Sequence, residues 1–235
     1  MIEHLKWDSN FFGFPTGTIR SVETPSILKE TLEKFRVQGY KLVYFFSDPG
    51  NVAVNQEALR NNGILADIKV SYGMVLNNNN TEPGCENIYL YDNDEPGETL
   101  YELALQSGEY SRFWTDKNFP SGTYEKLYKL WMLRSVKRIL ADEVFCYQKE
   151  GLIKGMITVY HKSDTGVIGL LGVDVSCRGE KIGSKLISHT KNFYLKKGIT
   201  KIEVVTQKAN KNACAFYEKS GFSIIKTENV YHFWL

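Results

Sequence analysis

The stretch that decides the fold reads Leu170-Leu171-Gly172-Val173-Asp174-Val175-Ser176-Cys177-Arg178-Gly179-Glu180-Lys181-Ile182-Gly183. Its apolar first half predicts a strand and its end opens a predicted helix, so a short turn joins the two. The first N–H groups of a helix lack partners within it and carry the positive end of its dipole. We therefore expect a phosphate or pyrophosphate site at this turn, where glycine lets backbone approach a ligand. A plain strand–helix turn is the alternative.

A second stretch follows a predicted strand at 201–205 and reads Asn210-Lys211-Asn212-Ala213-Cys214-Ala215-Phe216-Tyr217-Glu218-Lys219-Ser220-Gly221-Phe222. It has the pattern of a short helix that an asparagine caps and that ends at Gly221. Asn210, Ala213 and Tyr217 are spaced to share one helical face, where the small alanine leaves room for a ligand chain. A capping asparagine and a buried core tyrosine would explain the same residues without a ligand.

The chain divides near residues 77–86, whose asparagines, proline and glycine are typical of a linker. We expect an N-terminal α/β segment at 1–80, on the acceptor side, and a larger mixed α/β domain at 87–235. The apolar spacing predicts strands at 18–22, 41–46, 64–67, 70–76, 87–91, 144–149, 153–160, 166–175 and 201–205, and further strands within 222–235. It predicts helices at 27–38, 51–61, 97–106, 123–140, 181–196 and 212–219.

Together the two stretches resemble the GNAT superfamily of N-acetyltransferases. The coenzyme motif of that family is Arg/Gln-x-x-Gly-x-Gly/Ala, preceded by Val-x-Pro or a variant, and it is matched here by Val173, Val175, Arg178 and Gly183. Lys181 stands where the inner glycine is usual. The later motif of the family, Asn-x-x-Ala-x-x-apolar-Tyr-Glu-Lys-x-Gly-Phe, is matched at each specified position of the second stretch.

The resemblance implies a GNAT fold over residues 87–235, with a central mixed sheet flanked by helices and two strands splayed near Val173. It implies acetyl-CoA or another short acyl-CoA as co-substrate, and no metal. The strand end would pair with the pantetheine arm, the turn amides would hold the pyrophosphate, and Tyr217 would protonate the departing thiolate as a general acid. The residues implied to bind the coenzyme are Val173, Asp174, Val175, Arg178, Gly179, Glu180, Lys181, Ile182, Gly183, Asn210 and Tyr217.

The chemistry also needs a route for a proton, because the acceptor amine arrives as an ammonium and attacks only after losing one. A strand amide near Val173 can donate to the thioester oxygen as it gains charge. Four side chains are candidates for the base, and each is also explained as a surface or turn residue. They are Asp174, Glu109, Glu203 and His161, and a chain of waters is a further route.

Two short stretches, 7–13 and 109–113, resemble one branch of the family more closely. They read Trp7-Asp8-Ser9-Asn10-Phe11-Phe12-Gly13 and Glu109-Tyr110-Ser111-Arg112-Phe113. This branch, which includes the TDP-fucosamine acetyltransferases, acylates the amino groups of nucleotide-linked deoxysugars for surface polysaccharide. Arg112 is then a candidate for holding phosphate oxygens. The candidates for stacking on the base or the sugar are Trp7, Phe11, Phe12, Phe113 and Trp114. An aromatic packing core and an arginine–acid pair are the alternative.

Two other functions stay open. The first is a GNAT enzyme for another amine, such as a peptide N-terminus, an amino acid or an antibiotic. The second is a non-catalytic module that binds acyl-CoA. The sequence also leaves the oligomeric state open between a monomer and a homodimer.

Charge favours an anionic ligand for the C-terminal part of the chain. Residues 177–235 hold 11 basic and four acidic side chains, a local charge of +7, whereas the whole chain carries +2. Nucleic acid is not expected as the partner, because these lysines are scattered over predicted helices and strands without the motif of a known module.

The absence of membrane segments, of a signal sequence and of paired cysteines indicates where the protein is located and the redox state of its thiols. No stretch reaches the roughly 20 apolar residues that a membrane helix needs, and residues 1–10 lack the apolar run of a secretory signal. The cysteines Cys85, Cys146, Cys177 and Cys214 are far apart in sequence, which disfavours a disulfide framework or a zinc site. We expect a cytoplasmic protein with reduced thiols and no membrane partner.

Overall fold

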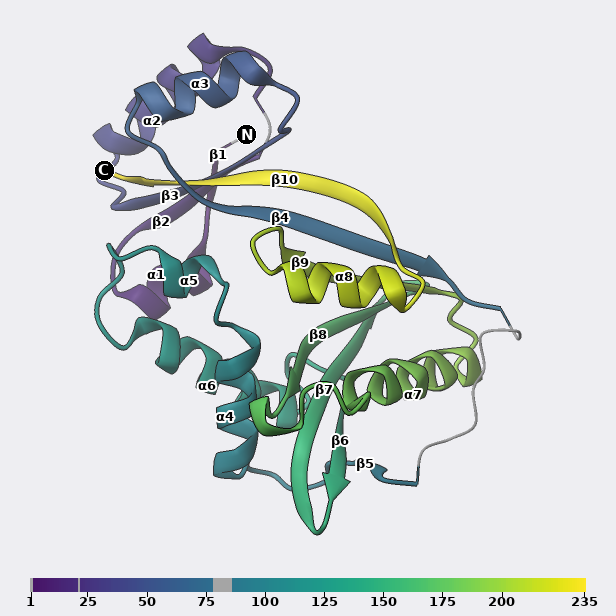
Figure 1. Ribbon diagram of the computed structural model, residues 1–235. Coiled ribbons are helices and arrows are strands. Elements are labelled where there is room, and N and C mark those ends of the chain that lie inside the picture. The colour runs from purple at the N-terminus through teal and green to yellow at the C-terminus, as the bar shows by residue number, and fades with distance from the viewer. Residues whose placement is uncertain (1, 21, 78–85) are drawn as a thin grey trace.

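Strands from all parts of the chain join one mixed sheet in the computed structural model, which describes residues 2–20, 22–77 and 86–235 (Figure 1). The strands are β1 (Ile2–His4), β2 (Thr16–Arg20), β3 (Leu42–Ser47), β4 (Ile64–Val75), β5 (Ile88–Leu90), β6 (Glu143–Lys149), β7 (Leu152–Lys162), β8 (Thr165–Val173), β9 (Lys201–Gln207) and β10 (Ser223–Trp234). Their order across the sheet is β1-β2-β3-β10-β4-β9-β8-β7-β6-β5. The pairs β2–β3 and β8–β9 are parallel.

Helices cover both faces of this sheet, which confirms the predicted fold class. They are α1 (Lys6–Phe12), α2 (Pro25–Val37), α3 (Val52–Arg60), α4 (Glu98–Ser107), α5 (Arg112–Thr115), α6 (Thr123–Val136), α7 (Ile182–Lys196) and α8 (Lys211–Lys219). Along β10, Tyr231 packs with α2 and α3, whereas the preceding residue, Val230, packs with α5 and α6. Helices α2, α3, α7 and α8 therefore lie on one face and α1, α4, α5 and α6 on the other. Within the described residues, no helix has the length and apolarity to cross a membrane.

The sheet runs across the predicted boundary between residues 1–80 and 87–235. Strand β4, from the N-terminal segment, lies between β9 and β10 and pairs with both. Residues 78–85, most of the predicted linker, lie outside the described residues. The N-terminal segment thus shares its sheet with the rest of the chain, and the core around Tyr44, Phe113 and Val230 draws on both parts.

A β-bulge bends β8 where its pairing with β9 ends. The register of β7 and β8 shifts between Ile157 and Val159, and the Leu170 amide donates to Thr158 Oγ1 at 2.8 Å. Gly169 is required beside it, since an added Cβ would lie 2.6 Å from that oxygen. Parallel pairing of β8 with β9 stops at Ile168 and Val204. Because a bulge bends its strand, the two strands separate toward Val173, as predicted.

Several predicted elements have different ends in the structure. The two strands predicted at 64–67 and 70–76 are the single strand β4, and the strand predicted at 166–175 ends at Val173. The helix predicted at 123–140 ends at Val136, because Arg138 takes a φ of 57° and the amides of residues 139 and 140 both turn back to the Arg134 carbonyl. The short helices α1 and α5 were not predicted, since seven and four residues are too few to show a helical period.

A buried acid–base pair ties the connection after α5 to the C-terminal strand. Asp116 Oδ2 lies 2.6 Å from His232 Nδ1 and accepts from Trp234 Nε1 at 2.9 Å, while Oδ1 accepts from the backbone and side-chain nitrogens of Asn118 at 3.0 and 2.8 Å. Burial alone would raise the pKa of Asp116, but the hydrogen bonds from His232 and its other partners lower it. Burial lowers the pKa of His232. We infer an ionised Asp116 that accepts from a neutral imidazole.

Asp116→Asn should therefore destabilise the fold, because an amide nitrogen would face donors that now meet a carboxylate. We expect the free energy of unfolding to fall by about 3 kcal/mol, measured by urea denaturation. The control is Asp142→Asn. Asp142 Oδ2 lies 2.6 Å from His161 Nδ1 in a second His–Asp pair, and the side chains of His161 and Asp142 are 49% and 35% exposed. That exposed pair should contribute less than about 1 kcal/mol. Equal losses in the two variants would contradict a special role for the buried pair.

Candidate active site

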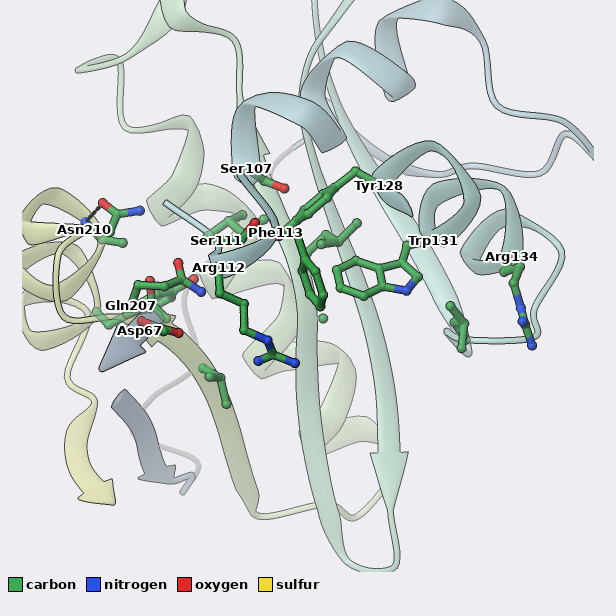
Figure 2. A pocket seen from close by; sticks show the side chains of 18 of the residues that line it. Asp67, Ser107, Ser111, Arg112, Phe113, Tyr128, Trp131, Arg134, Gln207 and Asn210 are labelled. Atoms are coloured by element: carbon green, nitrogen blue, oxygen red, sulfur yellow. Dashed lines mark hydrogen bonds between the residues drawn. The ribbon is translucent and has the colours of Figure 1, made fainter. Parts of the chain in front are cut away.

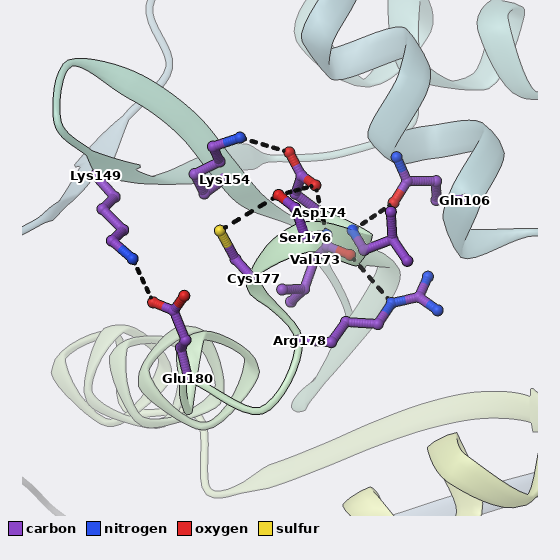
Figure 3. Close-up of polar contacts among 10 residues, drawn as sticks. Gln106, Lys149, Lys154, Val173, Asp174, Ser176, Cys177, Arg178 and Glu180 are labelled. Atoms are coloured by element: carbon purple, nitrogen blue, oxygen red, sulfur yellow. Dashed lines mark hydrogen bonds and ion pairs between the residues drawn. The ribbon is translucent and has the colours of Figure 1, made fainter.

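The turn between β8 and α7 is built on the side chain of Asp174. Its Oδ1 accepts from the amide and hydroxyl of Ser176 at 2.9 and 2.7 Å, and its Oδ2 accepts from Lys154 Nζ at 2.8 Å (Figure 3). These hydrogen bonds, that from Lys154 first, lower the pKa of Asp174 to about 2. A carboxylate held in this way shapes the turn and is too weak a base to deprotonate an ammonium.

Three further contacts fix the same turn (Figure 3). The Val175 amide donates to Gln106 Oε1 at 3.1 Å, which ties the turn to α4. Arg178 Nε donates to the carbonyl of Val173 at 3.5 Å. Glu180 accepts from Lys149 Nζ at 2.8 Å on the surface, a contact that lowers the pKa of Glu180.

The start of α7 offers backbone N–H groups to a ligand. In the part of the chain that the structure describes, no side chain caps this helix, so the amides of residues 182–184 lack helical partners. Lys181, the departure from the family motif, takes a φ of 60°, the left-handed conformation that glycine favours. The lysine therefore keeps the backbone path of the turn. Gly183 packs closely, since an added Cβ would lie 3.2 Å from the Phe216 ring.

A groove of about 700 Å³ follows this turn between α7 and α8, and we call it the coenzyme groove. Eight of the residues that the motifs implied line it: Val173, Arg178, Gly179, Lys181, Ile182, Gly183, Asn210 and Tyr217. Asp174, Val175 and Glu180 do not line it. Asn210 also caps α8, because its Oδ1 accepts from the Ala213 amide at 3.0 Å.

A second cavity, of about 550 Å³, lies over the opposite face of the sheet beneath α5 and α6 (Figure 2), and we call it the acceptor cavity. Five residues line both spaces: Ser107, Leu171, Asn210, Ala213 and Tyr217. Tyr217 belongs to the core on the α7 face. The two spaces therefore meet through the opening between β8 and β9.

Tyr217 is well suited to hold a proton at this junction. Its side chain is 6% exposed, and burial, with a smaller contribution from Cys214, raises the pKa of its hydroxyl. The hydroxyl is therefore protonated at neutral pH and can donate a proton to a group that develops negative charge beside it.

The structure brings Trp7, Arg112 and Phe113 together in the acceptor cavity, whereas the other predicted stacking residues, Phe11, Phe12 and Trp114, do not line it. It adds four that the sequence analysis missed: Asp8, Asp67, Trp131 and Arg134. Asp8 lies within the stretch 7–13, where only aromatic residues were predicted to contact the acceptor. The other three lie at distant positions on β4 and α6, where nothing in the sequence relates them to the motifs.

Two arginines of the acceptor cavity form no close ion pair in the part of the chain that the structure describes. Among the described residues, no carboxylate lies within 4 Å of the Arg112 or Arg134 guanidinium, and both Nε atoms are buried without a hydrogen bond. Arg112 instead stacks on the rings of Tyr44 and Phe113, at 4.7 and 4.6 Å, and Arg134 lies 6.0 Å from the ring of Trp7. Guanidinium groups held in this way attract anions.

Two half-buried carboxylates, Asp67 and Asp8, share the same cavity. Burial raises the pKa of Asp67 to about 6, although the Arg112 charge opposes this shift. Burial also raises the pKa of Asp8 against the same arginine. Both carboxyl groups therefore bind a proton more readily than an exposed aspartate does.

The four bases considered from the sequence lie elsewhere. Glu109 is exposed at the edge of the coenzyme groove, and Glu203 is an exposed residue of β9. His161 pairs with Asp142 on the surface, and Asp174 is held in the turn. None of them lines the acceptor cavity.

The described residues contain no cluster of side chains that could bind a metal ion. No three His, Cys, Asp or Glu side chains gather there as a metal ion would require. Cys146, Cys177 and Cys214 are free, and Cys85 lies outside the described residues.

A strand opening, uncapped amides at a helix start and a tyrosine at the junction of two cavities define a protein that binds a coenzyme thioester on one side and an acceptor on the other. Residues 98–222, more than half of the chain, match the model of the Acetyltransferase (GNAT) family. The chain therefore belongs to this family. It is an acyl-CoA-dependent N-acyltransferase, and acetyl-CoA is the co-substrate of its family.

Solved structures share the fold at low sequence identity. The GCN5-related N-acetyltransferase from Sphaerobacter thermophilus is 15% identical, with 99% of this chain and 75% of that one covered at a TM-score of 0.66. A functionally unknown conserved protein from Staphylococcus epidermidis is 10% identical, with 99% and 90% covered at 0.70. A tandem GNAT protein from the clavulanic acid biosynthesis pathway is 12% identical, with 94% and 75% covered at 0.57. No curated protein matches the chain. These likenesses show the fold alone.

Gly183→Asp should abolish coenzyme binding, because a carboxylate would lie against the helix-start amides and repel a pyrophosphate. Titration calorimetry with acetyl-CoA should show a dissociation constant that is higher by about 100-fold or more. The control is Gly183→Ala, which makes the same 3.2 Å contact with Phe216 without the charge and should weaken binding much less. Unchanged affinity in the aspartate variant would rule out a phosphate site at the start of α7.

Proposed function

We propose that this enzyme transfers an acyl group, acetyl by default, from coenzyme A to the amine of a nucleotide-linked amino sugar, of the TDP type, for surface polysaccharide. The observation that carries the proposal is the acceptor cavity, where Arg112 and Arg134 form no close ion pair within the described residues and several aromatic rings line the wall. This cavity adjoins the coenzyme groove. A nucleotide sugar offers a pyrophosphate for arginines and flat surfaces for aromatic rings. The resemblance of 7–13 and 109–113 to the aminosugar branch supports the same acceptor.

On the coenzyme side, we assign the pyrophosphate to the amides at the start of α7 and the turn before it. The unpaired edge of β8 near Val173 then pairs with the pantetheine arm, and its amides stabilise the thioester oxygen as charge develops. Asn210 borders both spaces and guides the arm toward Tyr217. Asp174, Val175 and Glu180 act indirectly, because they hold the turn in shape.

On the acceptor side, we assign the phosphates to Arg112 and Arg134 and the base or sugar to Trp7, Phe113 and Trp131. Figure 2 shows Trp131 and Arg134 on one side of the cavity and Asp67, Gln207 and Asn210 on the other. Since Asn210 also borders the coenzyme groove, the amine belongs at the Asp67 side and the nucleotide at the Arg134 side.

A second candidate acceptor is an amine without a nucleotide, such as an amino acid or a peptide N-terminus. The two carboxylates of the cavity, Asp8 and Asp67, would suit its ammonium group. Acylation assays with acetyl-CoA and a panel of TDP-linked amino sugars, free amino sugars, amino acids and peptides decide between the two. Turnover of a free amino acid or peptide, with none for any nucleotide sugar, would replace the proposed acceptor.

Tyr217→Phe tests the general acid. The substitution keeps the ring that packs against Phe222 and Tyr72 and removes only the proton donor, so acetyl-CoA affinity should hardly change. Turnover should fall by roughly 10²–10⁴-fold. Equal turnover in the two proteins, with saturating substrates and chemistry shown to limit the rate, would assign Tyr217 a packing role alone.

Arg112→Met tests the phosphate contact, because methionine keeps an apolar chain against Tyr44 and Phe113 and removes the charge. The Michaelis constant for a TDP-linked amino sugar should rise by about 10–100-fold, the loss of one charge-assisted contact of 1.5–3 kcal/mol, while that for acetyl-CoA should stay the same. The control is Lys117→Met, which removes a cation that also lies over a ring, 4.7 Å from Trp114, outside the acceptor cavity. An equal effect of both substitutions would point to long-range charge and contradict a direct contact.

A further inference from the structure

The acceptor cavity contains a carboxylate on the floor of the sheet, beside the junction with the coenzyme groove. Asp67 lies on β4, two residues before Lys69, which pairs with Gln207 of β9. In β10 its partner is Val230, whose side chain packs with α5 and α6, so the Asp67 side chain faces the same way. Figure 2 shows Asp67 on the side of the cavity where Gln207 and Asn210 lie. Asn210 borders both spaces, so this is the end that faces the coenzyme.

The other carboxylate of the cavity, Asp8, comes from a different element. Asp8 lies on α1 next to Trp7, whose ring is 6.0 Å from the Arg134 guanidinium. Its charge interacts with Arg112 and with the hydroxyl of Tyr44. Both aspartates interact with the Arg112 charge, but Asp8 follows Trp7 on α1, whereas Asp67 lies on the side of Asn210, which borders the coenzyme groove. The two aspartates therefore form a matched pair that differs in position.

We propose that Asp67 is the catalytic base, which takes a proton from the ammonium of the acceptor before the nitrogen attacks the thioester. This inference rests on the proposed acceptor cavity, and it applies to whichever primary amine the enzyme acylates. Among the described residues, Asp67 and Asp8 are the acidic side chains that line this cavity, and the four bases considered from the sequence do not reach it. Asp67 is the one at the coenzyme end.

The charged and titratable groups that face Asp67 come from its own strand and four neighbouring elements. Lys69 lies on β4 itself, and Glu228 of β10 pairs with that lysine at 3.6 Å. Arg112 of α5, Tyr128 of α6 and Asp8 of α1 border the same cavity. Burial raises the pKa of Asp67 to about 6, with Arg112 and then Lys69 opposing the shift. The carboxylate is thus largely ionised at neutral pH and yet more basic than a free aspartate, as a proton acceptor requires.

The protons balance with Tyr217 as the acid. One N–H proton of the ammonium passes to the Asp67 carboxylate, and the freed lone pair forms the C–N bond at the thioester carbon. The C–S bond breaks, and the sulfur takes the Tyr217 proton. The second proton lost by the new amide nitrogen returns to Tyr217, and Asp67 releases its own to solvent. The products are the amide, the free thiol and one proton.

The test compares the pH dependence of Asp67→Asn and Asp8→Asn with that of the wild-type protein, using acetyl-CoA and a TDP-linked amino sugar. In the wild type, kcat should fall as the pH drops through about 6, because the carboxylate becomes protonated. Asp67→Asn should lower kcat at neutral pH by roughly 10²–10⁴-fold and replace the limb near pH 6 by one centred on the higher pKa of the acceptor amine. Asp8→Asn should keep the acid limb. Calorimetry with acetyl-CoA should show the same affinity in all three proteins.

Methoxyamine is a second probe, because its conjugate acid is clearly more acidic than the Asp67 carboxyl, so its nitrogen stays unprotonated as the pH drops through about 6 and needs no base. Its acylation by the wild type should lack the acid limb, and Asp67→Asn should acylate it at nearly the wild-type rate. Asp67→Glu, which retains a carboxylate one methylene away, should recover part of the activity together with an acid limb. If Asp67→Asn loses coenzyme affinity, Asp67→Glu and the wild-type profile with methoxyamine still decide the question.

Two results would overturn the role of Asp67. One is an acid limb that stays near pH 6 in Asp67→Asn, and the other is an equal loss with methoxyamine and with the amino sugar while acetyl-CoA affinity is intact. Failure of the proposed acceptor looks different: the wild type would not acylate the TDP-linked amino sugar but would acylate another amine of the panel. The same comparison of Asp67→Asn and Asp8→Asn on that amine would then confirm or reject the base.

Discussion

The end of β8–β9 pairing at Ile168 and Val204 is the constraint on which the rest of the site depends. One half of β8 is fastened: the buried Tyr194 hydroxyl accepts from the Val167 amide at 3.1 Å and donates to the Tyr160 carbonyl at 2.6 Å. The other half is bent away by the bulge at Thr158. Buried backbone N–H and C=O groups need partners, so the separated strand edges are ready to pair with an extended ligand. The same opening lets one tyrosine of the α7 face border a cavity on the other face.

The two cavities are built from different parts of the chain. Residues 106–219 supply the whole lining of the coenzyme groove, and they fall within the 98–222 match to the family. Trp7, Asp8 and Asp67 of the acceptor cavity come from α1 and β4, outside that match. The coenzyme groove is thus formed by the segment that matches the family, while part of the acceptor cavity comes from the N-terminal strands and helices. Because β4 lies between β9 and β10, this segment is fixed in the sheet and cannot move independently of the junction.

The sequence predicts the parts of this site that are local. The strand, turn and helix around Val173 to Gly183 follow from adjacent residues, and the face shared by Asn210, Ala213 and Tyr217 follows from helical spacing. It does not predict Asp67, Trp131 or Arg134, because their meeting depends on how β4 and α6 pack across about 65 residues of chain. Local rules also mislead at Lys181, where a lysine adopts the backbone conformation of a glycine. At residues 123–140 the apolar spacing continues past the helix end that Arg138 sets.

The opposite charges of the acceptor cavity are coupled through Arg112. Its guanidinium lies over the rings of Tyr44 and Phe113 and lowers the pKa of Asp67 from the value that burial alone would give. An acceptor with a phosphate would neutralise part of this charge when it binds. The pKa of Asp67 would then rise toward the value set by burial, which makes the carboxylate a stronger base at the moment an ammonium lies beside it. An amine without an anionic group would leave the arginine charge in place and meet a weaker base. The arrangement therefore favours acceptors that carry both charges, and it does so through the basicity of Asp67 as well as through binding.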